Sequence, residues 1–438
     1  MDYPTALNYL FNQLPMFSRI GAAAYKKDLT NIVKLCAHFG NPQQQFKTIH
    51  IAGTNGKGST SHLLAATFQA AGYKTALYTS PHYLDFRERI KVNNKMISPQ
   101  FVIDFTIKIQ ELVKEIQPSF FEITVAMAFL YFQQQQVDIA IIETGLGGRL
   151  DSTNIINPIL SIITNIDYDH QDMLGDTLPK IAFEKAGIIK PNTPVLIGEP
   201  TNEINAVFID KAKLENANLY FAPDLANTQF INQSLEHSHY NCTDLASKQS
   251  HFITLQMLGS YQLKNLNTSF AAILLIQKYG NFNINIAHLQ TAAAQVQTTT
   301  GLYGRWQILQ KQPLTIADAA HNPHGIKYAT QQLRHTLKTY QLTHLHFIFG
   351  CVKDKDISSI LALLPKEATY YFCNAQIPRA KPAAALAAEA QQYHLSGEAY
   401  PTIAAALAAA KANCQTNQLL FIGGSIFVVG EALAEFTL

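Results

Sequence analysis

The chain has 438 residues, of which 33 are Lys or Arg and 31 are Asp or Glu. This near balance gives no charge excess that would argue for a nucleic-acid partner or a membrane surface. The length suggests about two to three domains, so any partner must be inferred from individual sites.

The five cysteines are far apart and never occur in C-x-x-C spacing. An odd, scattered set favours reduced thiols in the cores of a cytosolic protein over a disulfide framework or a zinc site. The first ten residues include Asp2 and no basic leader, so we expect no secretory signal. The longest apolar run, Ile123 to Phe132, is about half of a membrane span and is predicted to be a buried helix.

The N-terminal stretch Tyr9 to Phe39 has a helical pattern with a polar interruption at Ser18 to Lys27. The interruption fits a loop over an active site or the solvated start of a helix, and the sequence leaves both open.

The stretch Ile49 to Thr60, I-H-I-A-G-T-N-G-K-G-S-T, indicates a phosphate-binding loop. A buried strand is predicted at Thr48 to Ala52 and a helix at Ser59 to Ala71, with three glycines between them that permit a tight turn. Backbone N–H groups, the helix N-terminus and the Lys57 ammonium would then surround the β- and γ-phosphates of a nucleotide, and the Ser59 hydroxyl could reach Mg²⁺. The spacing G-x-x-G-K-G-S departs from the common G-x-x-x-x-G-K-[ST] loop, and a glycine-rich turn without a ligand is the alternative.

Apolar runs alternate with helical patterns along the rest of the first three hundred residues, which predicts a doubly wound, mostly parallel α/β sheet. Strands are expected at Lys74 to Thr79, Val137 to Glu143, Ile159 to Thr164 and Val195 to Gly198. Helices are expected at Phe120 to Phe132 and Leu263 to Tyr279. The polar stretch from Asn202 to Gln256 is interpreted as short antiparallel strands and loops.

A composition shift near residues 298–301 predicts a boundary between domains at 1–299 and 300–438. The C-terminal part repeats the α/β rhythm and is expected to be a smaller Rossmann-like domain. Its strands are predicted at Thr315 to Asp318, His346 to Phe349, Tyr370 to Cys373 and Leu419 to Ile422. Ala-rich helices are expected from Ala383 to Ala410.

Several polar residues follow predicted strands of the first sheet, where α/β folds place ligands. Glu143 and His170 could reach a cation held by Ser59, although a lone loop histidine is usually not a ligand. In the second part, Arg305 could contact phosphates and Asp318 could accept hydrogen bonds from a ribose or adenine, with a surface arginine and an ordinary strand-end aspartate as the alternative. Nothing in the residues themselves singles out Lys185.

Eight motifs occur in an order and spacing that resemble the Mur ligase superfamily, and more closely the folylpolyglutamate and dihydrofolate synthases. They are G-T-N-G-K-G-S, T-S-P-H, F-F-E, E-T-G-L-G-G-R-L-D-S-T-N, D-H, E-K-A-G-I, G-R-W-Q and D-A-A-H-N-P-H-G. The resemblance covers residues 50 to 325 and continues more weakly to the end. It implies an ATP-dependent ligase that phosphorylates a carboxylate and couples the acyl phosphate to L-glutamate.

The resemblance also implies site residues, by motif. The ATP ligands would be Thr54, Asn55, Gly56, Lys57, Gly58, Ser59, Asn265, Arg305, Asp318 and His321. Asn267 is the alternative to Asn265, and Tyr261 stands where the family often has His. Magnesium would be held by Ser59, Ser80, Glu143 and His170. The pterin substrate would contact Ser119, Phe120, Phe121, Glu122, Leu150, Asp151 and Ser152.

The catalytic residues would be Lys57, Lys185 and His170, with Lys185 matching a lysine that is carbamylated in relatives. The implied substrates are ATP, L-glutamate, dihydropteroate and reduced folates, which favours a bifunctional enzyme over a folylpolyglutamate synthase alone. A monovalent-cation requirement stays open. We expect a cytoplasmic monomer without a nucleic-acid or membrane partner.

Two other functions compete with this expectation. A peptidoglycan-precursor ligase of the same superfamily would usually carry a nucleotide-sugar domain before the loop, and only 52 residues precede Gly53. A nucleotide-binding scaffold without activity would be expected to have lost the cation and lysine positions, yet Lys57, Glu143, His170 and Lys185 are present.

Overall fold

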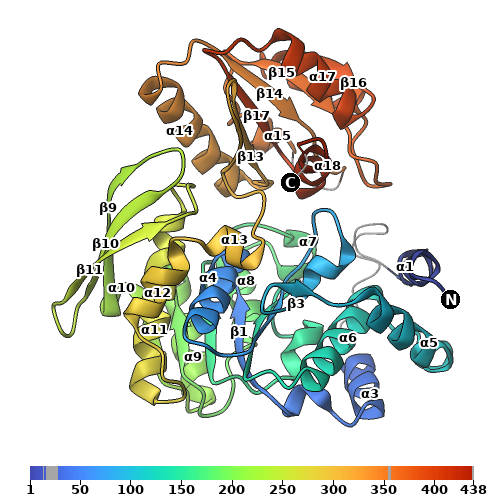
Figure 1. Cartoon of the computed structure of the whole chain (residues 1–438), viewed down its shortest axis with the longest axis vertical. Helices are drawn as coiled ribbons and strands as arrows, with labels where there is room; N and C mark the ends of the chain where they lie inside the picture. The colour runs from blue at the N-terminus through green and yellow to red at the C-terminus, as the bar shows by residue number, and fades with distance from the viewer. Residues whose placement is uncertain (13, 16–27, 354–356, 437–438) are drawn as a thin grey trace.

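The computed structural model describes residues 1–12, 14–15, 28–353 and 357–436. The predicted interruption at residues 18–27 lies outside this described part. The molecule contains two sheet systems, each a β-sheet with its covering helices, and one lies above the other (Figure 1). A small antiparallel sheet lies beside them.

The larger sheet has eight strands in the order β4-β3-β2-β5-β1-β6-β7-β8. They are β1 (Lys47–Ala52), β2 (Thr75–Tyr78), β3 (Ile90–Val92), β4 (Lys95–Met96), β5 (Ile139–Glu143), β6 (Leu160–Ile163), β7 (Val195–Ile197) and β8 (Leu219–Phe221). The strands from β2 to β8 in this order are parallel, and β3 and β4 add an antiparallel edge. The predicted doubly wound, mostly parallel sheet is therefore confirmed.

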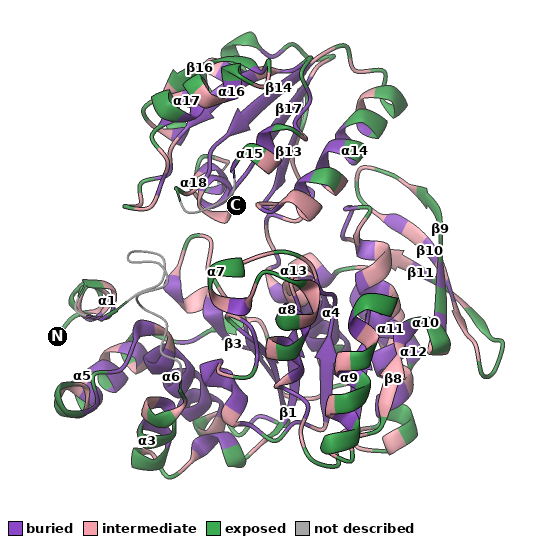
Figure 2. Cartoon of the chain, turned by 180° about the vertical axis from the view of Figure 1, so that it is seen from behind, coloured by how far each residue is buried: buried purple, intermediate pink, exposed green. Residues whose placement is uncertain are grey.

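Alternate residues of the central strands explain why both faces of this sheet are covered. In β5, Ile139 and Ile141 enter one core cluster, whereas Ala140 and Ile142 enter the cluster on the other face. A side-chain period of two places successive residues on opposite faces, so a continuous apolar run requires helices on both sides. Figure 2 shows the resulting buried sheet between helices whose outer faces are exposed.

Helices α6 and α11 lie close to their predicted bounds, whereas the first helix begins at Tyr3 and not at Tyr9 as predicted. They are α1 (Tyr3–Asn12), α3 (Thr30–His38), α4 (Lys57–Ala70), α5 (Pro99–Ile116), α6 (Phe120–Gln134), α7 (Gln171–Leu174), α8 (Leu178–Ala186), α9 (Asn202–Leu214), α10 (Ala222–Leu225), α11 (Gln262–Tyr279), α12 (Ile286–Ala293) and α13 (Val296–Thr300). Short 3₁₀ turns occur at η2 (Pro42–Gln44), η3 (Phe86–Arg89) and η4 (Ser152–Ile155).

The interpretation of residues 202–256 as strands and loops alone is wrong in its first part. Helix α9 and strand β8 lie there, before the predicted antiparallel strands β9 (Ala226–Gln233), β10 (Ser238–Asp244) and β11 (Ser250–Leu255). Helix α9 buries only Ile204, Phe208 and Ala212, one residue per turn, so its sequence pattern is mostly polar.

The second sheet has six strands in the order β12-β13-β17-β14-β15-β16, with β12 antiparallel to the rest. They are β12 (Gln307–Lys311), β13 (Leu314–Asp318), β14 (Leu345–Phe349), β15 (Thr369–Cys373), β16 (Ser396–Tyr400) and β17 (Leu419–Gly423). The helices are α14 (Pro323–Thr339), α15 (Ile357–Leu361), α16 (Ala383–Gln391), α17 (Ile403–Asn413) and α18 (Ile426–Ala434). The four predicted strands are confirmed, and the smaller Rossmann-like unit is present.

The two edge strands of this sheet, β12 and β16, were not predicted. The expected Ala-rich helical tract is interrupted by β16, whose residues are mostly exposed and pair only with β15. An edge strand with one partner and no buried face leaves no alternating apolar pattern in the sequence.

The predicted role of the cysteines as core residues is confirmed, since all five are buried and free. Burial raises the pKa of Cys36, Cys242 and Cys351 to about 12. The apolar run Ile123 to Phe132 is a buried part of α6. None of the helices in the described residues has both the length and the apolar content that crossing a membrane requires.

Candidate active site

The glycine-rich loop joins the carboxyl end of β1 to α4, which begins at Lys57. Gly56 is the N-cap of the helix and has a φ of 84°, a conformation that favours glycine. The Lys57 ammonium turns back over the loop and donates hydrogen bonds to the carbonyls of Gly53 (2.9 Å) and Thr54 (3.2 Å). The loop therefore places a cation at the positive end of a helix, where anions bind.

Residues after β6 hold this loop in shape. The Asn55 N–H donates to Oδ1 of Asn165 at 2.7 Å, and the Thr164 hydroxyl donates to the Asn55 carbonyl at 2.6 Å. The neighbouring Thr54 hydroxyl donates to the Asp167 carbonyl at 3.0 Å. Residues that directly follow the adjacent strand β6 thus hold the loop in this conformation.

Substitution Gly56→Ala is expected to lower AMPPNP affinity at least tenfold and to destabilise the fold by about 1–3 kcal/mol. An added Cβ would lie 2.3 Å from Oδ1 of Asn265, and the positive φ adds strain. Nucleotide titration and urea denaturation measure the two effects. Gly72→Ala is the matched control, because Gly72 has a φ of +87° but no atom within 4 Å of an added Cβ. Equal AMPPNP affinities of the two variants would contradict the assigned role of Gly56.

The carboxyl end of β5 delivers Glu143 to the same place. A Cβ added at Gly58 would lie 3.9 Å from both Glu143 carboxylate oxygens, and the Ser80 N–H donates to Glu143 Oε2 at 3.4 Å. Burial raises the Glu143 pKa to about 7, although Lys57 and Arg305 oppose this rise. A buried carboxylate of this kind suits a cation.

The side chains near Glu143 fit magnesium by chemistry. Ser59 Oγ accepts a hydrogen bond from Gln262 Nε2 at 3.1 Å, and Ser80 follows β2. Both hydroxyls are hard oxygen donors like the carboxylate. His170 is the N-cap of α7, and its Nε2 lies 3.8 Å from Oδ2 of Asp169. No three His, Cys, Asp or Glu side chains in the described residues form a metal-holding group, so hydroxyls, waters and phosphates would have to complete a magnesium shell.

Glu143→Gln is expected to raise the melting temperature of the ligand-free protein by a few degrees at pH 8. Folded Glu143 has its pKa near 7 and unfolded Glu143 near 4.5. Its contribution to stability is therefore fully present below pH 4.5 and is lost as pH rises through 7. Glutamine does not ionise, so the variant does not lose this stability as pH rises. Its gain in melting temperature over the wild type should therefore vanish near pH 4.5. Melting curves of both proteins from pH 4.5 to 8 measure this gain, and Glu115→Gln is the control because Glu115 is exposed. A difference in melting temperature that does not change with pH would refute the prediction.

Lys185, near the end of α8, is 4% exposed and donates from Nζ to the Gly53 carbonyl at 2.9 Å. Burial lowers its pKa to about 7, and nearby Lys57 lowers it further, while Asp169 and Asp151 act in the opposite direction. An amine with such a pKa is largely neutral slightly above pH 7 and can act as a nucleophile.

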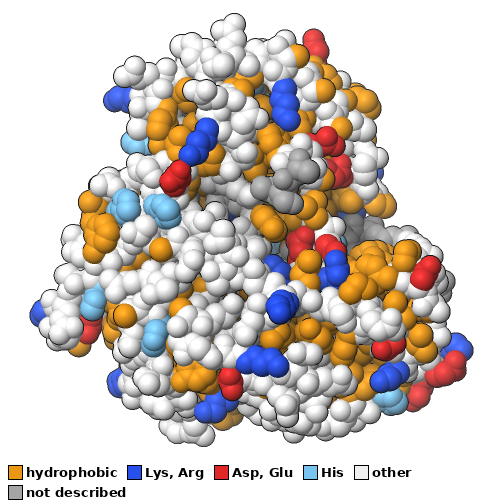
Figure 3. Space-filling model, viewed as in Figure 1, with side chains coloured by type: hydrophobic (Ala, Val, Ile, Leu, Met, Phe, Trp, Pro, Cys, Tyr) orange, Lys and Arg blue, Asp and Glu red, His pale blue; other side chains and the backbone are white. Residues whose placement is uncertain are grey.

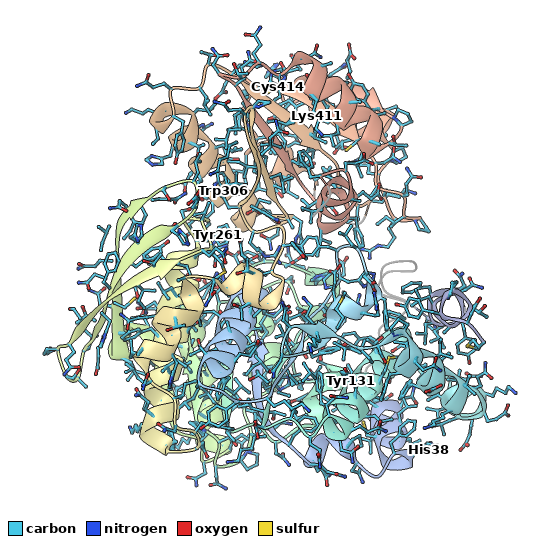
Figure 4. The ribbon with its side chains drawn as sticks, viewed as in Figure 1. His38, Tyr131, Tyr261, Trp306, Lys411 and Cys414 are labelled. Carbon is cyan, nitrogen blue, oxygen red and sulfur yellow. The ribbon has the colours of Figure 1, made fainter. Side chains whose placement is uncertain are left out.

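The second sheet contributes Arg305 and Asp318. The Asp318 carboxylate ends β13 and accepts hydrogen bonds from the Tyr261 hydroxyl (2.6 Å) and from the Trp306 and Ala320 N–H groups (both 2.8 Å). Figure 4 shows Tyr261 and Trp306 close together where the two parts of the molecule meet. Asp318 is thus a fixed acceptor at the junction.

Polar contacts from the N-terminus of α14 reach the glycine-rich loop. Asn322 Nδ2 donates to Asn55 Oδ1 at 3.0 Å, and His324 Nδ1 lies 3.2 Å from Asn55 Nδ2. His324 and His321 lie 3.5 and 3.6 Å from carboxylate oxygens of Asp167 and Asp169. Helix α14 begins at Pro323, with Asn322 as its N-cap.

One cavity of about 400 Å³ lies between the two sheets and brings nearly all of the predicted residues together. In the space-filling view, basic and acidic side chains gather in the hollow between the upper and lower parts (Figure 3). The predicted residues that line the cavity are Thr54, Asn55, Gly56, Lys57, Gly58, Ser59, Ser80, Ser119, Phe121, Glu122, Glu143, Leu150, Asp151, Ser152, His170, Lys185, Asn265, Arg305, Asp318 and His321.

Phe120 is the exception among the predicted residues. Its ring packs against Phe11 and Phe86, with the Arg89 guanidinium 5.3 Å from its centre, and its side chain belongs to the core. Successive residues of a helix point about 100° apart, so Phe121 faces the cavity while Phe120 cannot. The alternative Asn267 is placed elsewhere, where its Oδ1 accepts from Thr228 at 2.9 Å.

Several of the predicted pterin-contacting residues also stabilise the local backbone structure. Glu122 and Ser119 form a capping box at the start of α6, in which Glu122 Oε2 accepts from the Ser119 N–H at 2.6 Å. Glu122 Oε1 is buried with no hydrogen-bond partner among the described residues. Asp151 accepts the Leu146 and Thr153 N–H groups and so orders its own loop.

Sequence reasoning missed several residues of the cavity wall. They are Arg89, Asn165, Asp169, Glu199, Lys264, His324, Tyr328 and Arg379. Arg89 and Lys264 follow neither a glycine-rich loop nor the carboxyl end of a predicted strand, so no local sequence pattern indicated them.

Comparisons with known proteins identify the family of this chain. Residues 51–273 match the Mur ligase middle domain, and residues 304–426 match the Mur ligase glutamate ligase domain. The dihydrofolate synthase/folylpolyglutamate synthase of Bacillus subtilis is 31% identical over 93% of this chain and 94% of that protein. A probable bifunctional folylpolyglutamate synthase/dihydropteroate synthase of Haloferax volcanii is 29% identical over 100% of the chain, which spans about half (51%) of that protein's length.

Two solved structures extend the comparison. E. coli FolC in complex with DHPP and ADP has a TM-score of 0.85 and 26% identity, covering 99% of this chain and 97% of that one. A bifunctional folylpolyglutamate synthase/dihydrofolate synthase with Mn, AMPPNP and L-glutamate bound has a TM-score of 0.82 and 25% identity, covering 100% and 98%. The chain therefore belongs to the Mur ligase family, and within it to the dihydrofolate synthases and folylpolyglutamate synthases.

Proposed function

We propose that the protein is an ATP-dependent ligase that adds L-glutamate to dihydropteroate, forming dihydrofolate, and to folates, forming polyglutamates. The observation that carries the proposal is the cavity in which the glycine-rich loop, Glu143 and Lys185 meet Arg305 and Asp318 of the second sheet system. Nucleotide complexes of two relatives with this fold support it.

In the first step, a carboxylate oxygen of the acceptor attacks the γ-phosphorus of ATP, and the bond to ADP breaks. Lys57 and Arg305 stabilise the negative charge on the phosphoryl oxygens, because both are positively charged groups held at the loop. Asn265, Asp318 and His321 hold the rest of the nucleotide. Ser59, Ser80, Glu143 and His170 would hold Mg²⁺, which would supply further charge neutralisation.

In the second step, the glutamate nitrogen attacks the acyl carbon, forms a tetrahedral intermediate and expels phosphate as the nitrogen loses a proton. Closure of the cavity by the second sheet excludes water that would hydrolyse the acyl phosphate. The acceptor lies against Ser119, Phe121, Glu122 and the loop from Leu150 to Ser152, and we assign Phe120 to support this wall from behind.

We assign residues 1–299 to a nucleotide- and folate-binding domain and residues 300–438 to a closing domain. The chain passes from one sheet system to the other between α13 and β12, which supports this division. We assign the enzyme to the cytoplasm and to a monomeric state, and the near balance of charge gives no argument for a nucleic-acid partner. Replacing potassium with choline in the assay buffer tests for a monovalent-cation requirement.

The test is phosphate release by purified protein with MgATP and L-glutamate, first with dihydropteroate and then with tetrahydrofolate. Release with both acceptors, each matched by the glutamylated product in mass spectra, is expected. Release with tetrahydrofolate alone would remove the dihydrofolate synthase activity and leave a monofunctional enzyme. Release with neither would refute the ligase and favour a nucleotide-binding scaffold.

A further inference from the structure

The loop after β2 is rigidly held although it has little regular structure. The Glu88 carboxylate accepts the N–H groups of Tyr83 (2.7 Å), Leu84 (2.9 Å) and Asp85 (2.8 Å), and Asp85 caps the short turn that follows. Ser80 at the start of the loop donates to Glu143. The position of the Tyr83 backbone is therefore fixed by the first sheet system.

The Tyr83 side chain crosses from this loop into the second sheet system, where it packs against a core cluster that includes Ala317 and Val428. Two glycines make room for Tyr83: Gly304 faces its side chain and Gly430 faces its backbone. A Cβ at Gly304 would lie 2.6 Å from the Tyr83 hydroxyl, and a Cβ at Gly430 would lie 2.6 Å from the Tyr83 carbonyl oxygen. This close fit leaves the phenol little freedom to move.

The hydroxyl of Tyr83 meets the guanidinium of Arg305. Arg305 Nη1 donates to the Tyr83 oxygen at 2.5 Å and to the Gly304 carbonyl at 3.2 Å. The other terminal nitrogen, Nη2, lies 3.9 Å from where a Cβ would stand at Gly58, beside the start of α4. One end of the guanidinium is thus held by Tyr83, while the other end is directed at the glycine-rich loop.

We propose that Tyr83 is a positioning residue that holds Arg305 in its nucleotide-binding orientation before the nucleotide arrives. The inference deepens the proposed function and rests on its assignment of Arg305 to the ATP phosphates. A long arginine side chain samples many rotamers when it is free, and a bond from a pinned phenol removes most of them. The loop that carries Tyr83 also carries Ser80. The same segment therefore positions Ser80 directly and Arg305 through Tyr83.

The test is a double-mutant cycle read by nucleotide binding. Trp306 is the single tryptophan of the chain and adjoins Arg305, so its fluorescence can report titration with MgAMPPNP. Tyr83→Phe keeps the ring and removes the hydroxyl, and should weaken AMPPNP binding about tenfold, as expected for one hydrogen bond to a charged group. In an Arg305→Ala background, the same change should weaken binding less than about twofold.

A matched control is Tyr303→Phe, because the Tyr303 ring packs against the same cluster and no partner for its hydroxyl occurs in the described part of the chain. This variant should bind AMPPNP like the wild type. Equal losses from Tyr83→Phe in both backgrounds would show a general structural role and overturn the inference, as would no loss in either background.

The binding readout separates this inference from the proposed function. Wild-type protein that binds MgAMPPNP but releases no phosphate with any acceptor would refute the ligase, while the cycle would still decide the role of Tyr83. An active wild type with additive effects of the two substitutions would keep the ligase and refute the role of Tyr83.

Discussion

Lys57→Ala should lower the turnover number by about a thousandfold while the fold remains intact. The Lys57 ammonium lies at the N-terminus of α4 and bonds the Gly53 and Thr54 carbonyls, so it can stabilise charge that develops on the transferred phosphoryl group. Its side chain is partly exposed and adds little to the core, so the free energy of unfolding should change by no more than about 1 kcal/mol.

ADP release measured with each acceptor, together with thermal unfolding, checks both parts of this expectation. Lys95→Ala serves as the control, because Lys95 is an exposed lysine on the edge strand β4. An unfolded Lys57→Ala protein would mean that this lysine serves the loop structure, and a fully active one would remove Lys57 from catalysis.

Lys185→Ala should lower turnover by about a hundredfold or more, since it removes the nucleophilic amine that we propose is carbamylated. In that reaction the neutral amine nitrogen attacks the carbon of CO₂ and loses a proton, which leaves a carboxylate. The Lys185 pKa of about 7 makes neutral amine available near neutral pH. Below that pH the ammonium form cannot react, so carbamate formation should rise as pH increases through 7.

Carbon NMR of the protein in ¹³C-bicarbonate measures the carbamate directly, from pH 6 to 8. The signal should be present in the wild type and in Lys180→Ala, an exposed lysine of the same helix, and absent from Lys185→Ala. Added formate or acetate should restore part of the lost activity by replacing the missing carboxylate. A wild type without the signal, combined with an active Lys185→Arg variant, would refute carbamylation.

The central strands and the glycine-rich loop were predictable because their signals are local. Strands β1 and β5 are buried on both faces, so their apolar runs are continuous, and the loop needs glycine where φ is positive. Helix α6 was predictable at its first residue because Ser119 and Glu122 cap it. These features depend on residues within a few positions of one another.

The rest of the site depends on contacts that join distant parts of the chain. Arg89 and Lys264 reach the cavity only because separate strands and helices pack together, and Tyr83 meets Arg305 across 222 positions of sequence. The sequence around Lys185 does not indicate that this lysine is buried. Only the family resemblance identified it as a candidate. The edge strand β16 and the mostly polar helix α9 were missed because neither buries a full face.

The burial of all five cysteines has a practical consequence for measuring closure of the cavity. Because thiolates react with maleimides and the buried thiols have raised pKa values, the native cysteines should remain unlabelled under mild conditions. A pair of surface cysteines, one introduced on α9 and one on α17, would then accept dyes in an otherwise native background. Energy transfer between the dyes would report the approach of the two sheet systems during each catalytic cycle.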